Sequence, residues 1–178
     1  MRTALLLFAL ALAVALLAWW VGRGERSTDI AWDAIERDLA TRYPDVSTVS
    51  TAQLAERLGD ATAPLLLDAR DAEEYAVSHL PGARRVDPDA SPAELADALS
   101  DVDRQRAVVV YCSVGVRSAG VAQRLGEAGF DDVRNLEGSI FRWANEGREV
   151  VRDGEPVREV HPYDSLWGRL LSEDLRTP

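Results

Sequence analysis

The sequence predicts an α/β fold, with a central parallel sheet flanked by helices and one transmembrane helix before it. The first observation is a pair of continuous apolar runs, "APLLLDAR" at 63–70 and "RAVVVYC" at 106–112, which suit strands buried on both faces. The second is that strand-like and helical patterns alternate along the chain, as they do where crossover helices join parallel strands. The third is an uncharged run from Thr3 to Val21.

That uncharged run is long enough to span a membrane. At about 1.5 Å per residue, its nineteen residues can cross a hydrocarbon core of about 30 Å. The run ends in Trp19 and Trp20, which suit an interfacial aromatic belt better than the small-residue site of a cleaved signal peptide, the alternative interpretation. We therefore expect a single-pass membrane anchor, with the remaining chain on the periplasmic or outer side.

The other elements are predicted from apolar spacing and from residues that begin or end helices. Pro44 ends an amphipathic segment, and Gly129 closes a later one. Ser91 and Pro92 are a preferred N-cap and first helical residue. Besides the two buried strands, the expected elements are helices at 30–43, 51–58, 72–77, 91–102, 118–129 and 139–147, strands at 46–50, near 85–86 and at 131–138, a hairpin at 148–160, and a loosely helical end around Trp167.

The charge and cysteine content exclude several classes of function. With 20 basic and 30 acidic residues the formal net charge is −10, which disfavours binding to nucleic acid or to an anionic membrane surface. One cysteine excludes an internal disulfide, and two histidines with one cysteine leave no zinc-site spacing. We expect neither a metal nor a cofactor.

Cys112 is the only cysteine, and it ends a buried strand directly before a predicted helix. In a parallel sheet, functional sites lie at this edge. Gly115 permits positive φ, so that successive N–H groups of the turn can form an anion-binding concavity. The helix N-terminus, which Ser118 can cap, and the charge of Arg117 also favour thiolate, the nucleophilic form of the side chain. We therefore expect Cys112 to be a nucleophile.

A lone cysteine at a strand end is often only a small buried hydrophobe. An ordinary strand end, however, needs neither Gly115 nor Arg117 at these spacings after the cysteine, which favours the chemical interpretation.

Two stretches in this order resemble the rhodanese family: "DARDAEEYAVSHLPGARRV", and later "VVVYCSVGVRSAGVAQRLGEAGFDDVRNLEGSIFRWANEG". The resemblance implies sulfur transfer through a persulfide on Cys112. Thiosulfate or another persulfide would load the sulfur, and a thiol or cyanide would remove it. The loop that would supply the N–H cradle consists of Ser113, Val114, Gly115, Val116, Arg117 and Ser118.

The resemblance covers roughly residues 46–152 and sets the expected organisation. We expect a transmembrane anchor at 1–22, a linker with a juxtamembrane helix at 23–45, a rhodanese domain at 46–152 and a C-terminal tail at 153–178. Without a second cysteine, the persulfide must be discharged by a partner, either a small thiol or a protein sulfur acceptor.

Two other activities stay open. Phosphatases and arsenate reductases of the same fold separate Cys and Arg by five residues, whereas four separate Cys112 from Arg117, a loop that suits one sulfur atom. The chain could also be a partner-binding or sulfur-relay module with little free turnover.

The remaining motif residues favour structural interpretations. Asp68 and Arg70 could support the site, but such a pair more often forms a structural ion pair. His79 is a weak base candidate in a turn. Glu73 and Glu74 suit a solvated helix face. In the tail, His161, Tyr163 and Trp167 could fold over the mouth of the site, although packing on the surface is favoured.

Overall fold

The computed structural model describes residues 29–60 and 62–177. The chain divides into two compact units, Met1–Arg37 and Asp38–Pro178. Residues 29–42 are helical. The second unit holds the sheet and every element described below.

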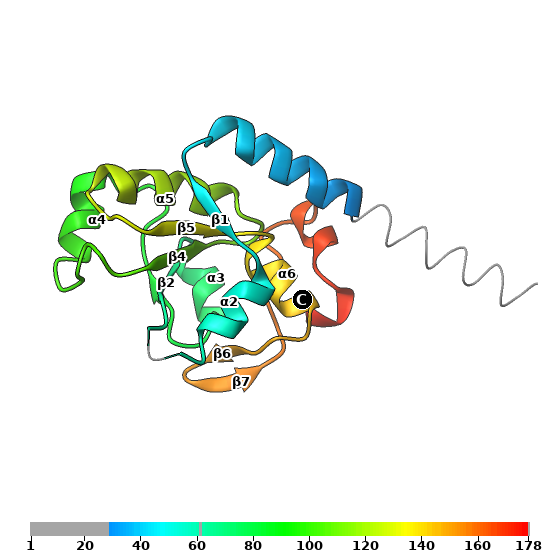
Figure 1. The fold of residues 1–178 in the computed structure, drawn as a ribbon. Coiled ribbons are helices and arrows are strands. Elements are labelled where there is room, and N and C mark those ends of the chain that lie inside the picture. Colours follow the sequence, from blue (N-terminus) through cyan, green and yellow to red (C-terminus); the bar gives the residue numbers. More distant parts are fainter. Residues whose placement is uncertain (1–28, 61, 178) are drawn as a thin grey trace, which may run out of the picture. The chain divides into compact units, whose positions relative to one another are not determined.

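Five parallel strands form the central sheet, in the order β1-β5-β4-β2-β3 (Figure 1). The strands are β1 Ser47–Val49, β2 Leu65–Asp68, β3 Arg84–Arg85, β4 Val108–Tyr111 and β5 Val133–Leu136. Every residue of β2 and β4 is buried, because helices cover both faces of the sheet there. The predicted α/β fold with a central parallel sheet is confirmed, and the two apolar runs form neighbouring strands.

Helices lie on both faces of the sheet (Figure 1). On one face α4 contacts α5, and on the other α2 contacts α6, with α3 beside them. Ser50 and Ser91 begin α2 and α4 with capping boxes, in which each serine and a Gln or Glu three residues later bond each other's backbone N–H. The helices are α2 Thr51–Arg57, α3 Ala72–Val77, α4 Pro92–Ala98, α5 Val116–Glu127 and α6 Ser139–Asn145.

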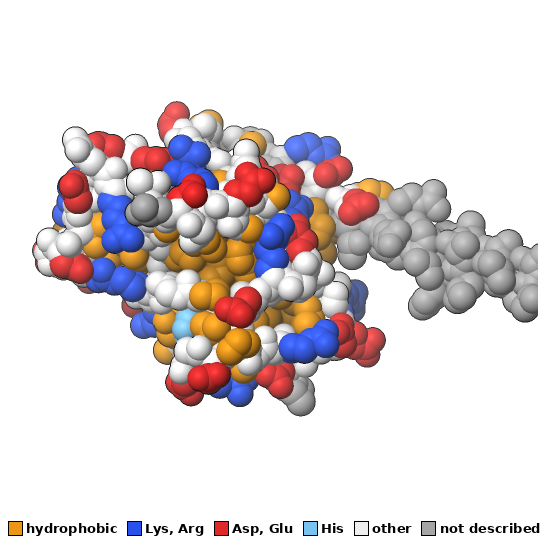
Figure 2. All heavy atoms as spheres, turned by 60° about the horizontal axis from the view of Figure 1, so that its bottom comes forward, with side chains coloured by type: hydrophobic (Ala, Val, Ile, Leu, Met, Phe, Trp, Pro, Cys, Tyr) orange, Lys and Arg blue, Asp and Glu red, His pale blue; other side chains and the backbone are white. Residues whose placement is uncertain are grey.

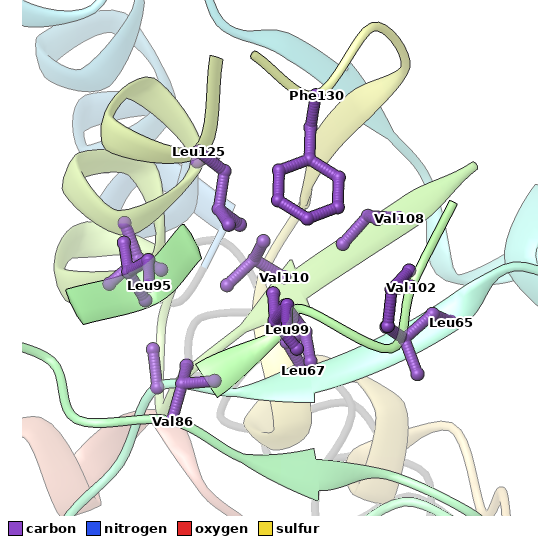
Figure 3. Packing of buried hydrophobic residues seen from close by; sticks show 13 residues of the cluster. Leu65, Leu67, Val86, Leu95, Leu99, Val102, Val108, Val110, Leu125 and Phe130 are labelled. Atoms are coloured by element: carbon purple, nitrogen blue, oxygen red, sulfur yellow. The ribbon is translucent and has the colours of Figure 1, made fainter. Parts of the chain in front are cut away.

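The main hydrophobic cluster lies between the sheet and the α4–α5 layer (Figure 3). Leu67 and Val110, which are partners in the register of β2 and β4, are fully buried there with Leu125 of α5. This packing fixes the ends of β2 and β4 relative to the start of α5, and residues 112–115 connect β4 to α5.

The chain after the sheet is folded against the same unit. The hairpin of β6 (Val150–Arg152) and β7 (Glu155–Val157) is joined to the turn before β3 through backbone bonds between Val151 and His79. Further on, Val160 pairs with Arg176, which closes a loop containing two short 3-10 helices, η1 Trp167–Leu170 and η2 Glu173–Leu175.

The described residues contain no helix that is both long and apolar enough to cross a membrane. Their helices reach fourteen residues at most, where a span needs about twenty apolar ones. This finding corrects the expectation of a membrane-anchored protein with its domain on the periplasmic or outer side. The predicted span itself, at 1–22, lies outside the described residues.

Candidate active site

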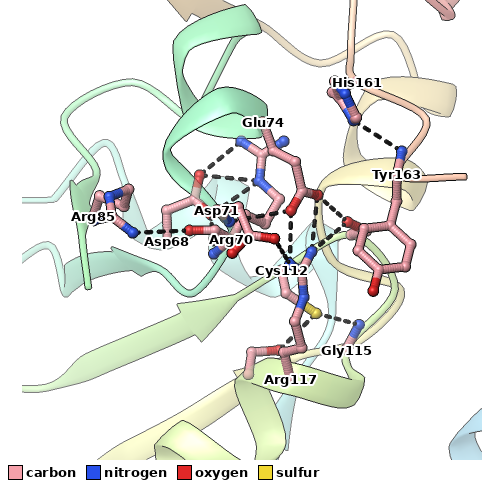
Figure 4. A network of polar contacts seen from close by, with 12 residues as sticks. Asp68, Arg70, Asp71, Glu74, Arg85, Cys112, Gly115, Arg117, His161 and Tyr163 are labelled. Atoms are coloured by element: carbon pink, nitrogen blue, oxygen red, sulfur yellow. Dashed lines mark hydrogen bonds and ion pairs between the residues drawn. The ribbon is translucent and has the colours of Figure 1, made fainter. Parts of the chain in front are cut away.

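Cys112 follows β4 at the carboxyl edge of the sheet, and its side chain is 1% exposed (Figure 4). The Gly115 N–H donates to its Sγ at 3.1 Å, and the Ser118 hydroxyl lies 3.5 Å from the same atom. Both groups come from the first turns of α5, so the sulfur faces the positive end of the helix dipole. Of the predicted cradle, the structure brings the Gly115 N–H and the Ser118 hydroxyl closest to the sulfur.

Gly115 is the N-cap of α5 and has φ +109°, a value that L side chains rarely adopt. A Cβ at this position would lie 3.3 Å from Leu39 Cδ1 and 3.5 Å from Asn135 Nδ2. The turn therefore needs glycine for its backbone angle and for the space around it.

Asn135 of β5 holds the loop in place. Its amide donates to the Gly115 carbonyl at 3.1 Å, and its Oδ1 accepts from the Ser118 hydroxyl at 2.7 Å. Ser118 thus differs from the expectation that it caps α5, because Asn135 binds its hydroxyl within the helix. Asn135 was not singled out from the sequence, although a polar residue near the end of a strand beside β4 is a usable signal.

The first residues of α6 hydrogen-bond to the same loop. The Ser139 hydroxyl accepts from the Cys112 N–H at 3.1 Å and donates to the Leu136 carbonyl at 3.2 Å. The N–H groups of Ile140 and Phe141 bond the carbonyls of Cys112 and Ser113, each at 3.1 Å. Backbone groups of Cys112 and Ser113 are therefore bonded to the start of α6, which fixes the position of the loop.

Glu74 of α3 is part of the site, which corrects the expectation that it lies on a solvated face with Glu73. Glu73 is exposed, but Glu74 is 2% exposed. Its two oxygens accept from Arg117 at 2.6 and 2.8 Å, and one of them accepts from the Ser113 hydroxyl at 2.9 Å. The charge pattern of two adjacent glutamates could not show which one faces the loop.

The Arg117 guanidinium is consequently neutralised, whereas the sequence suggested a fixed positive charge beside the loop. It also donates to Asp71 at 3.1 Å. Burial alone would raise the pKa of Glu74, but the hydrogen bonds and charge of Arg117 hold that pKa below its ordinary value. Burial alone would lower the pKa of Arg117, but Glu74, with smaller effects from the Cys112 sulfur and Asp71, raises it.

Asp68 and Arg70 form a fully buried ion pair, with Arg70 Nη2 2.7 Å from Asp68 Oδ2. Arg70 also donates to the Ser78 carbonyl, which fastens β2 to the end of α3. Burial would lower the pKa of Arg70, and Asp68 raises it. Neither residue lines the cavity at Cys112, so their contacts are those of the structural ion pair.

A cavity of about 100 Å³ opens at the cysteine. Tyr163 and Trp167 of the tail form part of its wall, which corrects the favoured expectation that the tail packs elsewhere on the surface. The Tyr163 ring lies 4.7 Å from Arg117 Cζ, in cation–π contact. The remaining lining residues are Cys112, Ser113, Val114, Val116 and Arg117.

The two histidines lie outside this cavity. His79 stacks on Tyr75 with ring centroids 3.9 Å apart, and its Nδ1 lies 3.1 Å from the Tyr75 carbonyl. His161 Nδ1 accepts from the Tyr163 N–H at 3.0 Å. Within residues 29–60 and 62–177, no group of three or more His, Cys, Asp or Glu side chains could hold a metal ion.

Comparison with known proteins identifies curated relatives of this domain. A sulfurtransferase of Allochromatium vinosum is 32% identical over 106 residues, which cover 60% of this chain and 95% of the relative. The probable adenylyltransferase/sulfurtransferase MoeZ of Mycobacterium tuberculosis is 32% identical over 109 residues, 61% of this chain and 27% of the relative. A tRNA uridine(34) hydroxylase of Enterobacter is 26% identical over 163 residues, 89% of this chain and 46% of the relative. The chain thus spans about a quarter of MoeZ and about half of the hydroxylase.

Solved structures show the same fold. A rhodanese-like domain protein from Staphylococcus aureus superposes with a TM-score of 0.52 at 27% identity, covering 61% of this chain and 99% of that one. The BH2092 protein of Bacillus halodurans gives a TM-score of 0.52 at 22% identity, covering 68% and 86%, and is a likeness of fold alone. The family description of the rhodanese-like domain matches residues 50–146, and on this match the chain belongs to the rhodanese-like domain family.

Proposed function

We propose that this chain is a sulfurtransferase that carries sulfane sulfur as a persulfide on Cys112. The family match and the sulfurtransferase relatives support a general sulfurtransferase activity. The observation that carries the proposal is the position of the sulfur, which accepts from the Gly115 N–H at 3.1 Å at the N-terminus of α5. At this place a backbone N–H can donate to the sulfur in both steps of the transfer.

In the loading step, the Cys112 thiolate attacks the outer sulfur of the donor. With thiosulfate, a new S–S bond forms, the donor's S–S bond breaks, and sulfite leaves with the bonding electron pair. In the second step, the thiolate of an acceptor attacks the outer sulfur of the persulfide, and the Cys112 thiolate leaves. Thiosulfate or a related persulfide is the proposed donor, and a thiol or cyanide is the proposed acceptor.

The acceptor is proposed to be a separate molecule, because the chain has no second cysteine. A small thiol or a protein thiol would meet this need, and nucleic acid is not a proposed partner. The formal net charge is −10, and acidic and arginine side chains are interspersed on the face shown in Figure 2 without a continuous basic surface there.

A sulfur-relay module with little free turnover is the second candidate. The neutralised Arg117 favours it, because a free dianionic donor finds no unpaired guanidinium among the residues that line the cavity. A phosphatase is disfavoured, because the four-residue spacing leaves less room for a tetrahedral oxyanion.

The test is sulfur loading measured by mass. The 178-residue chain, reduced and then incubated with thiosulfate or an alkyl persulfide, should gain about 32 Da, one sulfur atom, and lose it again with a thiol. The Cys112→Ser chain should keep its circular dichroism spectrum and gain nothing, because a hydroxyl is a far weaker nucleophile. Loading by persulfide but not by thiosulfate would favour the relay module. Loading of the serine variant, or none in the wild type with either donor, would rule out the mechanism.

A further inference from the structure

The segment 161–170 contributes two side chains to the wall of the cavity at Cys112, and it lies outside the stretch that matches the family description. We call Tyr163 and Trp167, the two members of this segment that line the cavity, the aromatic cap. Trp167 is half-buried, and Tyr163 is 45% exposed at the outer side. The sulfur site is therefore completed by side chains that follow the domain in the chain.

The aromatic cap is held by specific bonds on its own segment. Asp164 Oδ1 accepts from the N–H groups of Leu166 and Trp167, each at 2.8 Å, which fixes the turn between the two aromatic residues. Tyr163 has φ +65°, a value that non-glycine residues adopt only when surrounding contacts impose it. A Cβ added at Gly168 would lie 2.9 Å from Pro162 Cβ, so the segment packs closely on itself.

The segment is also fastened to the domain at both sides of the cap. The Asn145 amide of α6 donates to the Leu170 carbonyl at 2.7 Å and accepts from the Ser172 N–H at 2.8 Å. On the cavity side, the Tyr163 ring lies over the Arg117 guanidinium, which Glu74 orients. These contacts fix the position of the aromatic cap relative to Cys112.

The space left under the cap is small. Its volume is about 100 Å³. The stem of a sulfur carrier would pass between aromatic rings and the side chains of Val114 and Val116, which are apolar walls. A stem that branches at the carbon next to sulfur is wide close to the sulfur, where these walls lie, whereas an unbranched stem of the same volume extends away from them.

We infer that Tyr163 and Trp167 determine the size specificity of the sulfur site. Sulfur carriers whose sulfur ends an unbranched stem, such as primary alkyl thiols and persulfides, reach Cys112, whereas carriers branched at the carbon next to sulfur are excluded. For sulfur transfer, this inference rests on the proposed function; for access to the thiol, it stands on the cavity alone.

The test uses two isomeric reagents, the n-butyl and tert-butyl methanethiosulfonates, with the 178-residue chain. In each reaction the Cys112 thiolate attacks the alkyl-bearing sulfur, a mixed disulfide forms, and methanesulfinate leaves with the electron pair of the broken S–S bond. Because the chain has one cysteine, the mass gain reports this site alone. The ratio of the n-butyl to the tert-butyl rate constant is divided by the same ratio for 2-mercaptoethanol, which removes the intrinsic difference between the reagents.

We expect the normalised ratio of the wild type to be at least about tenfold. Trp167→Ala and Tyr163→Ala should each lower it toward one by speeding the tert-butyl reaction. Leu166→Ala is the matched control, since Leu166 is 63% exposed on the same segment and does not line the cavity, and its ratio should equal that of the wild type.

A wild-type ratio near one would overturn the inference, as would cap variants that fold and keep the wild-type ratio. If Trp167→Ala loses its thermal unfolding transition, Tyr163→Ala decides the question, because its ring is nearly half exposed. The readout does not depend on sulfur transfer. A chain that shows the size selectivity but fails to load sulfur refutes only the proposed function, and a chain that loads sulfur without selectivity refutes only the aromatic cap.

Discussion

The guanidinium of Arg117 and the carboxylate of Glu74 are joined by two parallel hydrogen bonds, Nη1–Oε2 at 2.6 Å and Nη2–Oε1 at 2.8 Å. This bidentate geometry is the strong form of an arginine–carboxylate pair. The pair links α3 to α5 across the mouth of the sulfur site and removes a free positive charge from it. Stabilisation of an anionic sulfur therefore falls to N–H groups of the loop and to the start of α5.

Replacing Glu74 should destabilise the fold. Glu74→Gln replaces the buried carboxylate at Arg117 by a neutral amide and leaves the exposed Asp71 as the ionised partner, and we expect the free energy of unfolding to fall by about 2–3 kcal/mol. Glu73→Gln is the matched control, because Glu73 is exposed one residue earlier on the same helix, and it should change stability by less than about 0.5 kcal/mol. Urea unfolding followed by circular dichroism measures both, and equal stability of the two variants would contradict the role of the pair.

The contribution of Glu74 should depend on pH. Burial alone would raise the pKa of this carboxyl, but Arg117 holds it below 4.5, its ordinary value. A carboxyl whose pKa is lowered by folding binds more protons in the unfolded state, so its stabilisation is complete above the ordinary value and is lost as the pH falls through the lowered one. The difference in unfolding free energy between wild type and Glu74→Gln should shrink from about pH 6 to about pH 3. A difference that is constant or grows over this range would contradict the assignment.

Gly115→Ala should damage both the fold and the site. The positive φ and the approach of Leu39 predict a loss of about 1–3 kcal/mol in unfolding free energy. Since the Gly115 N–H is bonded to Cys112 Sγ, sulfur loading should also slow.

Gly126→Ala is the matched control for Gly115→Ala. Gly126 lies in α5, has no heavy atom within 4 Å of an added Cβ, and shows no positive φ, so alanine there should stabilise by about 0.5–1 kcal/mol. Thermal unfolding and mass-detected loading separate the two variants. A Gly115→Ala chain with wild-type stability and loading would show that the turn tolerates a side chain.

Lengthening the loop should weaken sulfur transfer. One glycine inserted after Val114 moves the Gly115 N–H away from Cys112 Sγ and gives the loop the five-residue spacing of the phosphatases that share this fold. We expect slower sulfur loading. We also expect a weak release of phosphate from a small aryl phosphate, because phosphoryl transfer requires three oxygens to be bound at once and the longer loop offers more room for them. The wild-type chain should release none under conditions in which it loads sulfur. Rapid hydrolysis by the wild type without any loading would favour the phosphatase assignment.

The fold could be predicted because its signals are local. The apolar runs that became β2 and β4, and the Ser-Pro start of α4, carry their information within a few residues. The position of Cys112 followed from the same rule, since a residue after a parallel strand lies at the carboxyl edge of the sheet.

What the sequence could not show depends on contacts between distant residues. Glu74 and Arg117 lie on different helices, and only the ion pair between α3 and α5 in the folded chain reveals which glutamate faces the loop. Asn135 is recognised only once β5 is known to lie next to β4. Tyr163 and Trp167 reach the cavity because a pairing of Val160 with Arg176 turns the tail back, and no periodic pattern announces such a pairing.

The strand order also bears on how the chain matures during synthesis. β1 emerges first, yet its neighbour in the sheet is β5, with Ser47 opposite Arg134, so β1 has no strand to pair with until almost the whole domain has been made. β5 is the strand that carries Asn135, which holds Gly115 and Ser118 in place. The strand that completes the sheet therefore also brings the residue that shapes the cysteine loop. A nascent chain still lacking β5 carries Cys112 without its finished cradle.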